Sequence, residues 1–351
     1  MGARRPVQRH GQRLPRQGMS APGLIDIHSH MTPRALPVDP GSSAPWPCMR
    51  CQDAARATLM LGDKPFRELD DRSWDVARRC EDMDRDGVAI QLLSPMPELL
   101  SYWQDAAHAE YLADHVNAAI AEMVARRPDR FRGLAMVPMQ EPARAARYMR
   151  DLKARFGVDG IEIGSNVGGA LPGEERFAPV FAAAEAGDLA IFVHALHPVA
   201  TAAVMRHAPF FTPMVGFPLD VAMAGASLIT EGVLERHPRL RIALSHGGGA
   251  MASLIGRLDQ GWRMVPELRD RLSTAPSAQA RRLFYDSNVY EPALLRHVAR
   301  DMAPGQVCAG TDYPYLIMQE DPAAFIASAD LTAGEADSVR RGAATRFLDI
   351  R

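Results

Sequence analysis

The chain has 351 residues, of which 47% are hydrophobic and 23% are charged, and its formal net charge is −2. This composition is typical of a globular protein with a sizeable core, and the near-neutral charge excludes an electrostatic attraction to nucleic acid or to a membrane surface. No stretch approaches the ~18–20 apolar residues of a membrane-spanning helix. Four cysteines without a secretory signal indicate a cytoplasmic location.

The amino-terminal residues differ in character from the rest of the chain. Residues 1–18 are basic and polar, and a hydrophobic strand follows soon after Met19. We therefore expect residues 1–20 to form a basic, disordered tail and residues 21–351 to form one domain.

A single C-x-x-C motif is formed by Cys48 and Cys51. A zinc or redox site of this type needs a second cysteine pair or a thioredoxin-like context, and the sequence offers neither. The motif therefore does not predict such a site.

Short apolar runs recur along the chain and alternate with amphipathic segments. The runs are typical of parallel strands that are buried on both faces, and they cover residues 24–28, 88–94, 131–138, 159–165, 189–195, 240–246, 282–288 and 306–312. The clearest helices between them are predicted over residues 74–86, 106–127, 141–156 and 177–186.

Eight strands that alternate with helices predict an α/β fold, a distorted (β/α)₈ barrel. An open, doubly wound sheet is the main alternative, but no phosphate-binding glycine loop follows an early strand. The stretch of about 31–73 is too long for an ordinary βα loop, and we expect it to be a small insertion over the mouth of the barrel. Residues 197–218 are predicted to form a second long βα loop.

Four histidines and one aspartate stand at the predicted ends of strands, and these are His28, His30, His194, His246 and Asp312. Active sites of (β/α)₈ barrels lie at these carboxyl ends. Since residues i and i+2 of a strand point to the same side, His28 and His30 can face one ion together. With His194 and Asp312 they form a mixed nitrogen and oxygen ligand set, which favours Zn²⁺ over Co, Fe or Mn.

The sequence resembles the amidohydrolase superfamily, within it the branch of the amidohydrolase 2 family that contains aminocarboxymuconate semialdehyde decarboxylase. The resemblance runs from about residue 24 to residue 348. It is carried chiefly by IDIHSHMTP (25–33), FRELDDRSWD (66–75), MDRDGVAIQLLSPMP (83–97), SHGGGA (245–250) and GTDYPY (310–315).

The resemblance implies a role for each matching residue. His28, His30, His194 and Asp312 would hold one Zn²⁺ per subunit, and His246, the general base, would act in catalysis together with Asp312. Arg67 and Arg257 would bind substrate carboxylates. In the family the second arginine reaches the neighbouring subunit's site, which implies a homodimer that shares Arg257 across its interface.

The two lysines of the chain limit the number of ions. Binuclear members of the superfamily bridge two metals with a carbamylated lysine at the end of the fourth strand. That strand ends in IEIGSN here, and the lysines are Lys64 and Lys153. We therefore expect a single ion.

Three positions around the predicted substrate site depart from the decarboxylase pattern. Leu196 and Pro213 stand where the family has tryptophans, and Ser165-Asn166 replaces a Thr-His pair. The metal, base and arginine positions are retained. The sequence thus predicts a zinc-dependent, non-oxidative decarboxylase of a small unsaturated or aromatic carboxylic acid, and the altered loops leave a metal-dependent hydratase or hydrolase of a related dicarboxylate or lactone as the alternative. A binding protein without activity is a third possibility.

Overall fold

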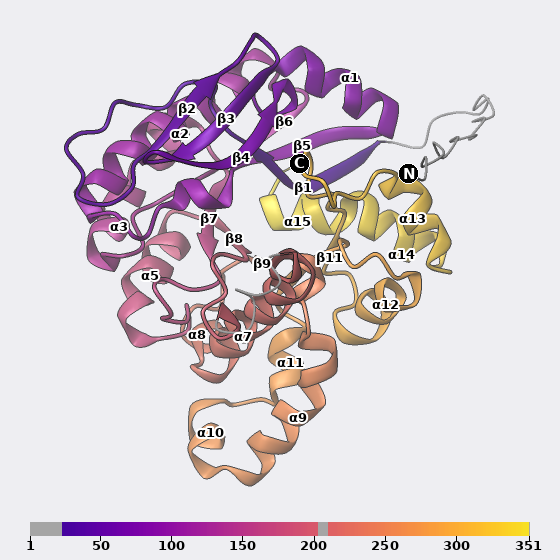
Figure 1. Cartoon of the computed structure of the whole chain (residues 1–351). Coiled ribbons are helices and arrows are strands. Elements are labelled where there is room, and N and C mark those ends of the chain that lie inside the picture. Colours follow the sequence, from indigo (N-terminus) through magenta and orange to yellow (C-terminus); the bar gives the residue numbers. More distant parts are fainter. Residues whose placement is uncertain (1–22, 203–209, 351) are drawn as a thin grey trace, which may run out of the picture.

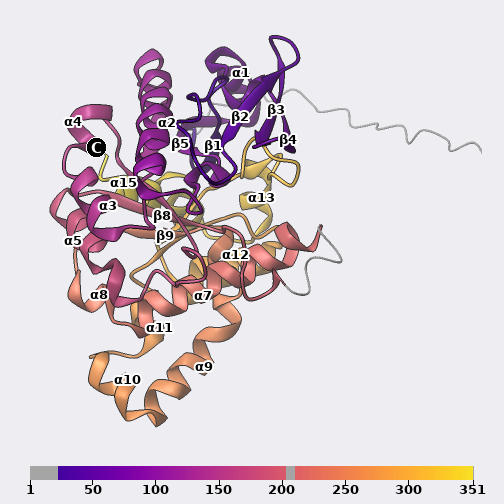
Figure 2. The ribbon, with the colours of Figure 1, turned by 60° about the vertical axis from the view of Figure 1, so that its left-hand side comes forward.

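The computed structural model describes residues 23–202 and 210–350 (Figure 1). The predicted disordered tail, residues 1–20, lies outside the described residues. In the described part, a barrel of parallel strands forms the centre, and helices surround it (Figures 1 and 2).

Eight parallel strands follow one another around the barrel in chain order. They are β1 (Leu24–Met31), β5 (Val88–Pro95), β6 (Phe131–Ala135), β7 (Gly160–Gly164), β8 (Ala190–His194), β9 (Ile242–Leu244), β10 (Phe284–Asp286) and β11 (Val307–Cys308). The last strand returns to the first, because the Ile27 amide donates to the carbonyl of Ala309 at 2.9 Å. The predicted (β/α)₈ barrel is confirmed, and the open doubly wound sheet is excluded by this closure.

The interior of the barrel has an apolar floor and a polar top. Inward side chains such as Ile25, Ile27 and Phe192 form one buried cluster with Phe347 of the carboxyl-terminal helix α15 (Ala343–Leu348). The pairing of β1 with β5 shifts register between Asp26 and Ser29. Such an irregularity changes the direction of the side chains. The first part of β1 therefore contributes Ile25 and Ile27 to the apolar floor, and its last part contributes His28 and His30 to the polar top.

The insertion after β1 contains a small antiparallel sheet. Its strands are β2 (Pro47–Cys51), β3 (Arg56–Leu61) and β4 (Lys64–Asp70), in the order β2-β3-β4. Only the central strand is largely buried, whereas β2 and β4 are mostly exposed. The sheet lies beside β1 and α1 in Figure 2. Weak sequence periodicity here reflects edge strands that bury few side chains.

The helices of the first half of the barrel agree with the sequence with one exception. They are α1 (Val76–Asp86), α2 (Ala106–Arg126), α3 (Pro142–Met149), α4 (Leu152–Phe156) and α5 (Ala178–Ala186). The predicted helix 141–156 is wrong as a single element, because it is divided into α3 and α4 around Arg150 and Asp151. No glycine or proline marks this break.

The helices of the second half of the barrel are short, apart from α7 and α9. They are α7 (Phe217–Thr230), α8 (Val233–Arg236), α9 (Met251–Met264), α10 (Pro266–Arg271), α11 (Pro276–Ala280), α12 (Pro292–His297), α13 (Pro322–Ser328) and α14 (Ala333–Asp337). In both views α9 and α10 project away from the barrel (Figures 1 and 2).

The predicted loop 197–218 ends in helix rather than in coil. A π-helical segment, η4 (Thr212–Gly216), continues directly into α7. The combined helix, Thr212–Thr230, is long and apolar enough to cross a membrane by length and composition, which differs from the sequence expectation. Val221, Ala224 and Leu228 are fully buried in the hydrophobic core. Packing against the barrel accounts for the apolar composition of α7, as for core helices in general.

Candidate metal centre and active site

A cage of four side chains lies at the carboxyl ends of the barrel strands. One ligand atom each from His28, His30, His194 and Asp312 falls within 4.8 Å of the others, and all four residues are buried. The Nε2 atoms of His28 and His30 are 3.1 Å apart, and each is 3.3 Å from Oδ1 of Asp312. These separations fit ligands that converge on one divalent ion.

The unpaired atoms of the cage are of the kind that bind a metal ion. His194 is 3% exposed, and its Nε2 has no hydrogen-bond partner among the described residues. Its Nδ1 lies 2.8 Å from the carbonyl of Ala195, and Nδ1 of His30 lies 3.1 Å from that of Pro95. A proton on each Nδ1 leaves the Nε2 lone pair free for a metal, so the residues fit the ion that the sequence predicts.

The electrostatics of the cage suit a cation. Burial, together with the neighbouring imidazoles of His30 and His28, holds the pKa of His194 well below its usual range. Burial alone would raise the pKa of Asp312, but the imidazole of His28 holds it well below its usual value. Burial alone would lower the pKa of His28, but the carboxylates of Asp312 and Asp286 raise it to about 10, so the site holds a positive charge between two carboxylates. The His28 proton would be displaced on metal binding, because a neutral imidazole and an ionised carboxylate are the forms that bind metals.

Asp286, at the end of β10, supports the cage from behind, and sequence reasoning missed it. Its Oδ2 lies 2.5 Å from Nδ1 of His28 and accepts a bond from the His246 amide at 2.9 Å. Its Oδ1 accepts from the Gly247 amide at 2.7 Å. A carboxylate on the far nitrogen of a ligand histidine fixes the ring's orientation. A polar residue at the end of a predicted strand, as in YDSN (285–288), is the signal that was available.

Glu162 of β7 is a second buried carboxylate that sequence reasoning missed. Its Oε2 is 3.8 Å from Nδ1 of His30, and burial raises its pKa to about 8.

The two lysines of the chain lie away from the cage. Lys153 lies on α4, where its Nζ donates to the carbonyl of Asp188 at 2.7 Å. Lys64, the other lysine, is exposed on β4, whereas all four cage residues are buried.

His246 follows β9 at the start of the triple-glycine segment. Its ring centroid lies 5.2 Å from those of both His28 and His194. Burial, followed by the charge of His28, lowers the pKa of His246 to about 4. The tight approach of this loop to α7 explains its composition, because a Cβ on Gly249, at φ +59°, would lie 1.8 Å from the carbonyl oxygen of Pro218.

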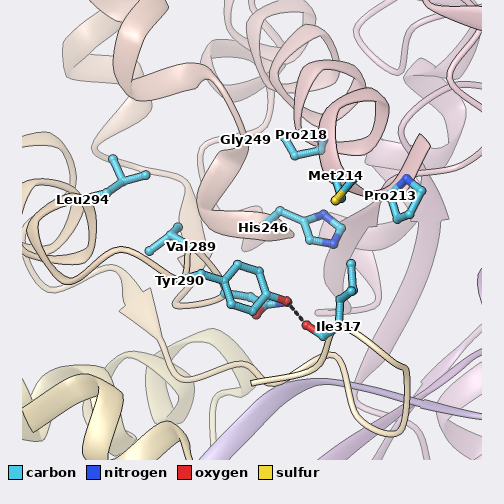
Figure 3. A pocket seen from close by; sticks show the side chains of 10 residues that line it. Pro213, Met214, Pro218, His246, Gly249, Val289, Tyr290, Leu294 and Ile317 are labelled. Carbon is cyan, nitrogen blue, oxygen red and sulfur yellow. Dashed lines mark hydrogen bonds between the residues drawn. The ribbon is translucent and has the colours of Figure 1, made fainter. Parts of the chain in front are cut away.

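Two adjoining cavities open beside the cage. The first, of about 510 Å³, has His246 on its wall and is otherwise mainly apolar, as Figure 3 shows for Pro213, Met214 and Ile317. The second, of about 370 Å³, shares Pro213 and Ile317 with the first and is lined by Asp312 and Arg67. Together they form a depression beside the cage, and its wall carries the acidic ligand Asp312 and the guanidinium groups of Arg67 and Arg72.

Arg67 of β4 reaches this depression, whereas Arg257 does not. The guanidinium of Arg67 stands over the Tyr315 ring at 4.5 Å, and its Nη2 lies 3.4 Å from Glu98. Arg257 is exposed on the projecting helix α9 and lines neither cavity. The single chain therefore brings together every predicted site residue except Arg257.

The positions that depart from the decarboxylase pattern form a connection between loops. Asn166 donates through Nδ2 to the carbonyl of Leu196 at 2.7 Å and to Asp220 of α7 at 2.9 Å. Ser165 donates to the same carboxylate. This network ties the loops after β7 and β8 to α7, and Pro213 borders both cavities.

Comparisons with known proteins show the family of the chain. A family model described as Amidohydrolase (Amidohydro_2) matches residues 25–350. A 2-amino-3-carboxymuconate-6-semialdehyde decarboxylase of Dictyostelium discoideum is 30% identical over 331 residues, which cover 93% of this chain and 91% of that protein.

Two solved structures are also similar. A 5-carboxyvanillate decarboxylase of Sphingomonas paucimobilis has a TM-score of 0.78 and 26% identity, and the match covers 94% of this chain and 100% of that one. Another, of Novosphingobium aromaticivorans, complexed with manganese and 4-hydroxy-3-methoxy-5-nitrobenzoic acid, has a TM-score of 0.71 and 26% identity, with 80% and 82% covered.

Proposed function

The chain belongs to the amidohydrolase family, and its similarity to named decarboxylases identifies it as a metal-dependent decarboxylase. We propose that its ion is Zn²⁺ and that its substrate is a small unsaturated or aromatic carboxylic acid. The observation that carries this proposal is the cage of His28, His30, His194 and Asp312 next to a largely apolar cavity. An apolar cavity with a few polar groups suits a planar, unsaturated acid.

Three imidazole nitrogens and one carboxylate oxygen are a ligand set that Zn²⁺ favours. A manganese ion is bound in one similar decarboxylase, so Mn²⁺ is the first competitor to test. When bound, the ion supplies Lewis-acid stabilisation of negative charge on the substrate.

His246 is the residue we propose for proton transfer, with Asp312 beside it as the acidic ligand. Loss of CO₂ breaks a C–C bond and leaves an electron pair on carbon; as the general base, neutral His246 would take a proton from water and deliver it to that carbon. The His246 ring lines the apolar cavity, and its Nδ1 lies 3.0 Å from the Ser245 hydroxyl. His246→Ala should therefore retain the metal and lose nearly all turnover. A collapse of its metal content would make His246 a ligand instead.

Arg67 is the residue we propose to bind a substrate carboxylate. Its guanidinium is oriented by the Tyr315 ring and by Glu98, and it faces the cavity that Asp312 also lines. A guanidinium binds a carboxylate through two parallel hydrogen bonds. The carboxylate of a substrate would thereby be oriented over the ligand cage.

We propose that Arg257 acts in the active site of a second copy of the chain. It lies on the exposed helix α9, which packs against α7. The two helices and η4 expose Met214 (53%), Leu219 (40%) and Leu254 (37%), an apolar surface that a homodimer would cover. In that dimer, Arg257 of each subunit would complete the partner's site.

Mixing variants tests this shared site. Arg67→Ala and Arg257→Ala proteins should each lose activity, but in a randomly exchanged mixture roughly a quarter of the sites would carry both arginines. Restored activity in the mixture supports sharing. Complete absence of rescue, with subunit exchange verified, would exclude it.

The reaction itself is tested with the metal-loaded protein. Aminocarboxymuconate semialdehyde and hydroxybenzoate-type acids should release CO₂, and the reaction should stop when the ion is removed by a chelator and return with Zn²⁺. Absence of CO₂ from every acid would contradict decarboxylation. Solvent ¹⁸O retained in a product without CO₂ would instead identify the hydratase or hydrolase reaction.

A further inference from the structure

Asn288, two residues beyond β10, lines the apolar cavity next to His246. The residue is only 2% exposed, yet neither Nδ2 nor Oδ1 of its carboxamide has a hydrogen-bond partner among the described residues. Buried carboxamides are nearly always hydrogen-bonded, so an unpaired one on a cavity wall requires an explanation.

The backbone holds Asn288 firmly in this position. Its amide donates to Oδ1 of Asp286 at 3.0 Å, and the same oxygen accepts from the Gly247 amide at 2.7 Å. Asp286 in turn is bonded to the metal ligand His28. The carboxamide is therefore anchored to the framework of the cage, although its own polar atoms are free.

The other polar side chains of the cavity wall already have a hydrogen-bond partner or a proposed role in the reaction. The Tyr290 hydroxyl donates its proton to the carbonyl of Ile317, so toward the neighbouring Asn288 carboxamide it can only accept, and Oδ1 of Asn288 stays unpaired. His246 is the proton-transfer residue of the proposed reaction. Among the polar side chains that line this cavity in the described chain, Asn288 is left to meet a ligand.

We propose that Asn288 is a specificity-determining residue, which binds a hydroxyl substituent of the substrate inside the apolar cavity; this inference rests on the proposed function. A carboxamide offers both a donor and an acceptor, and a hydroxyl group can satisfy both at once. A methyl group at the same place would leave the carboxamide unpaired. Sites built in this way reject the analogue that lacks the polar group.

The test uses binding, so that it does not depend on turnover. Nitrobenzenes that carry either a hydroxyl or a methyl group at position 2, 3 or 4 cannot lose CO₂, and their affinities for the full-length, metal-loaded protein are measured by calorimetry. At one ring position at least, the hydroxyl compound should bind about tenfold more tightly than its methyl partner.

Three variants separate recognition from shape. Asn288→Leu should reduce the hydroxyl preference to less than about twofold, because it cannot hydrogen-bond. Asn288→Ala, which adds no bulk and cannot hydrogen-bond, should also lose the preference, so that steric blocking is not the cause. Leu294→Val, elsewhere on the same wall, should keep it. Unchanged metal content and melting temperature verify that the variants fold.

Two results would overturn the inference. The first is a wild-type protein that prefers no hydroxyl compound at any position, and the second is a preference that survives in Asn288→Leu. Failure of the proposed function would give a different result: the preference for hydroxyl compounds would remain, but no acid would release CO₂.

Discussion

The barrel sheet and the inserted sheet differ in the burial of their polar residues. At the barrel mouth, His28, His194 and Asp312 are buried and arranged around one point. On the inserted sheet, Cys48, Cys51 and Glu68 are exposed, and only β3 is well buried. Removing a polar group from water costs free energy unless a partner repays it. Buried polar groups are thus the ones that indicate function, and the exposed ones tolerate change.

The largest effect is expected from removal of a cage ligand. Asp312→Ala deletes the carboxylate that lies 3.3 Å from Nε2 of both His28 and His30. Loss of a ligand should cost more than the about 10–100-fold in metal affinity that loss of a supporting residue costs, so metal content should collapse and CO₂ release should fall to background. Metal analysis after gel filtration measures the loss. Glu81→Ala, an exposed carboxylate on α1, is the control and should retain a full equivalent; equal metal content in both variants would refute the ligand assignment.

This cage is also the part of the molecule that the sequence predicts best. Its residues stand at the ends of apolar runs, and parallel strands bring all such ends to one face. Asp286 was missed because the sequence does not say which strand-end residue lies behind a ligand and which lies in front. The strands of the inserted sheet were missed for a different reason, since edge strands that bury few side chains leave little periodicity.

Gly249, in the loop after β9, and Gly256, on the exposed helix α9, extend the comparison to the backbone. Gly249→Ala would place a Cβ 1.8 Å from the Pro218 carbonyl at a positive φ, whereas a Cβ on Gly256 of α9 meets nothing within 4 Å. Gly249→Ala should lower the free energy of unfolding by about 2–4 kcal/mol and displace His246. Gly256→Ala should raise it by about 0.5–1 kcal/mol. Urea denaturation measures both, and equal values would show that the loop relaxes freely.

A smaller effect is expected one step behind the cage. Asp286→Asn keeps the shape but removes the charge that faces Nδ1 of His28 at 2.5 Å. Substitution of such a supporting carboxylate costs about 10–100-fold in metal affinity. Competition with a chromophoric chelator measures this affinity. Asp270→Asn, on the exposed helix α10, is the matched control. An unchanged affinity in Asp286→Asn would mean that the backbone alone orients His28.

The smallest effect is expected on the inserted sheet. Cys48 and Cys51 are free and exposed, and being three residues apart on β2 they point to opposite faces of the sheet. The double variant Cys48→Ser, Cys51→Ser should therefore change the free energy of unfolding by less than about 0.5 kcal/mol and leave metal content unaltered. In the native protein these two thiols should react with a thiol reagent, whereas Cys80 and Cys308, both buried, should react only after unfolding. Loss of a second equivalent of metal in the double variant would reveal a second ion on the insertion, and the contrast between buried and exposed polar groups would then fail.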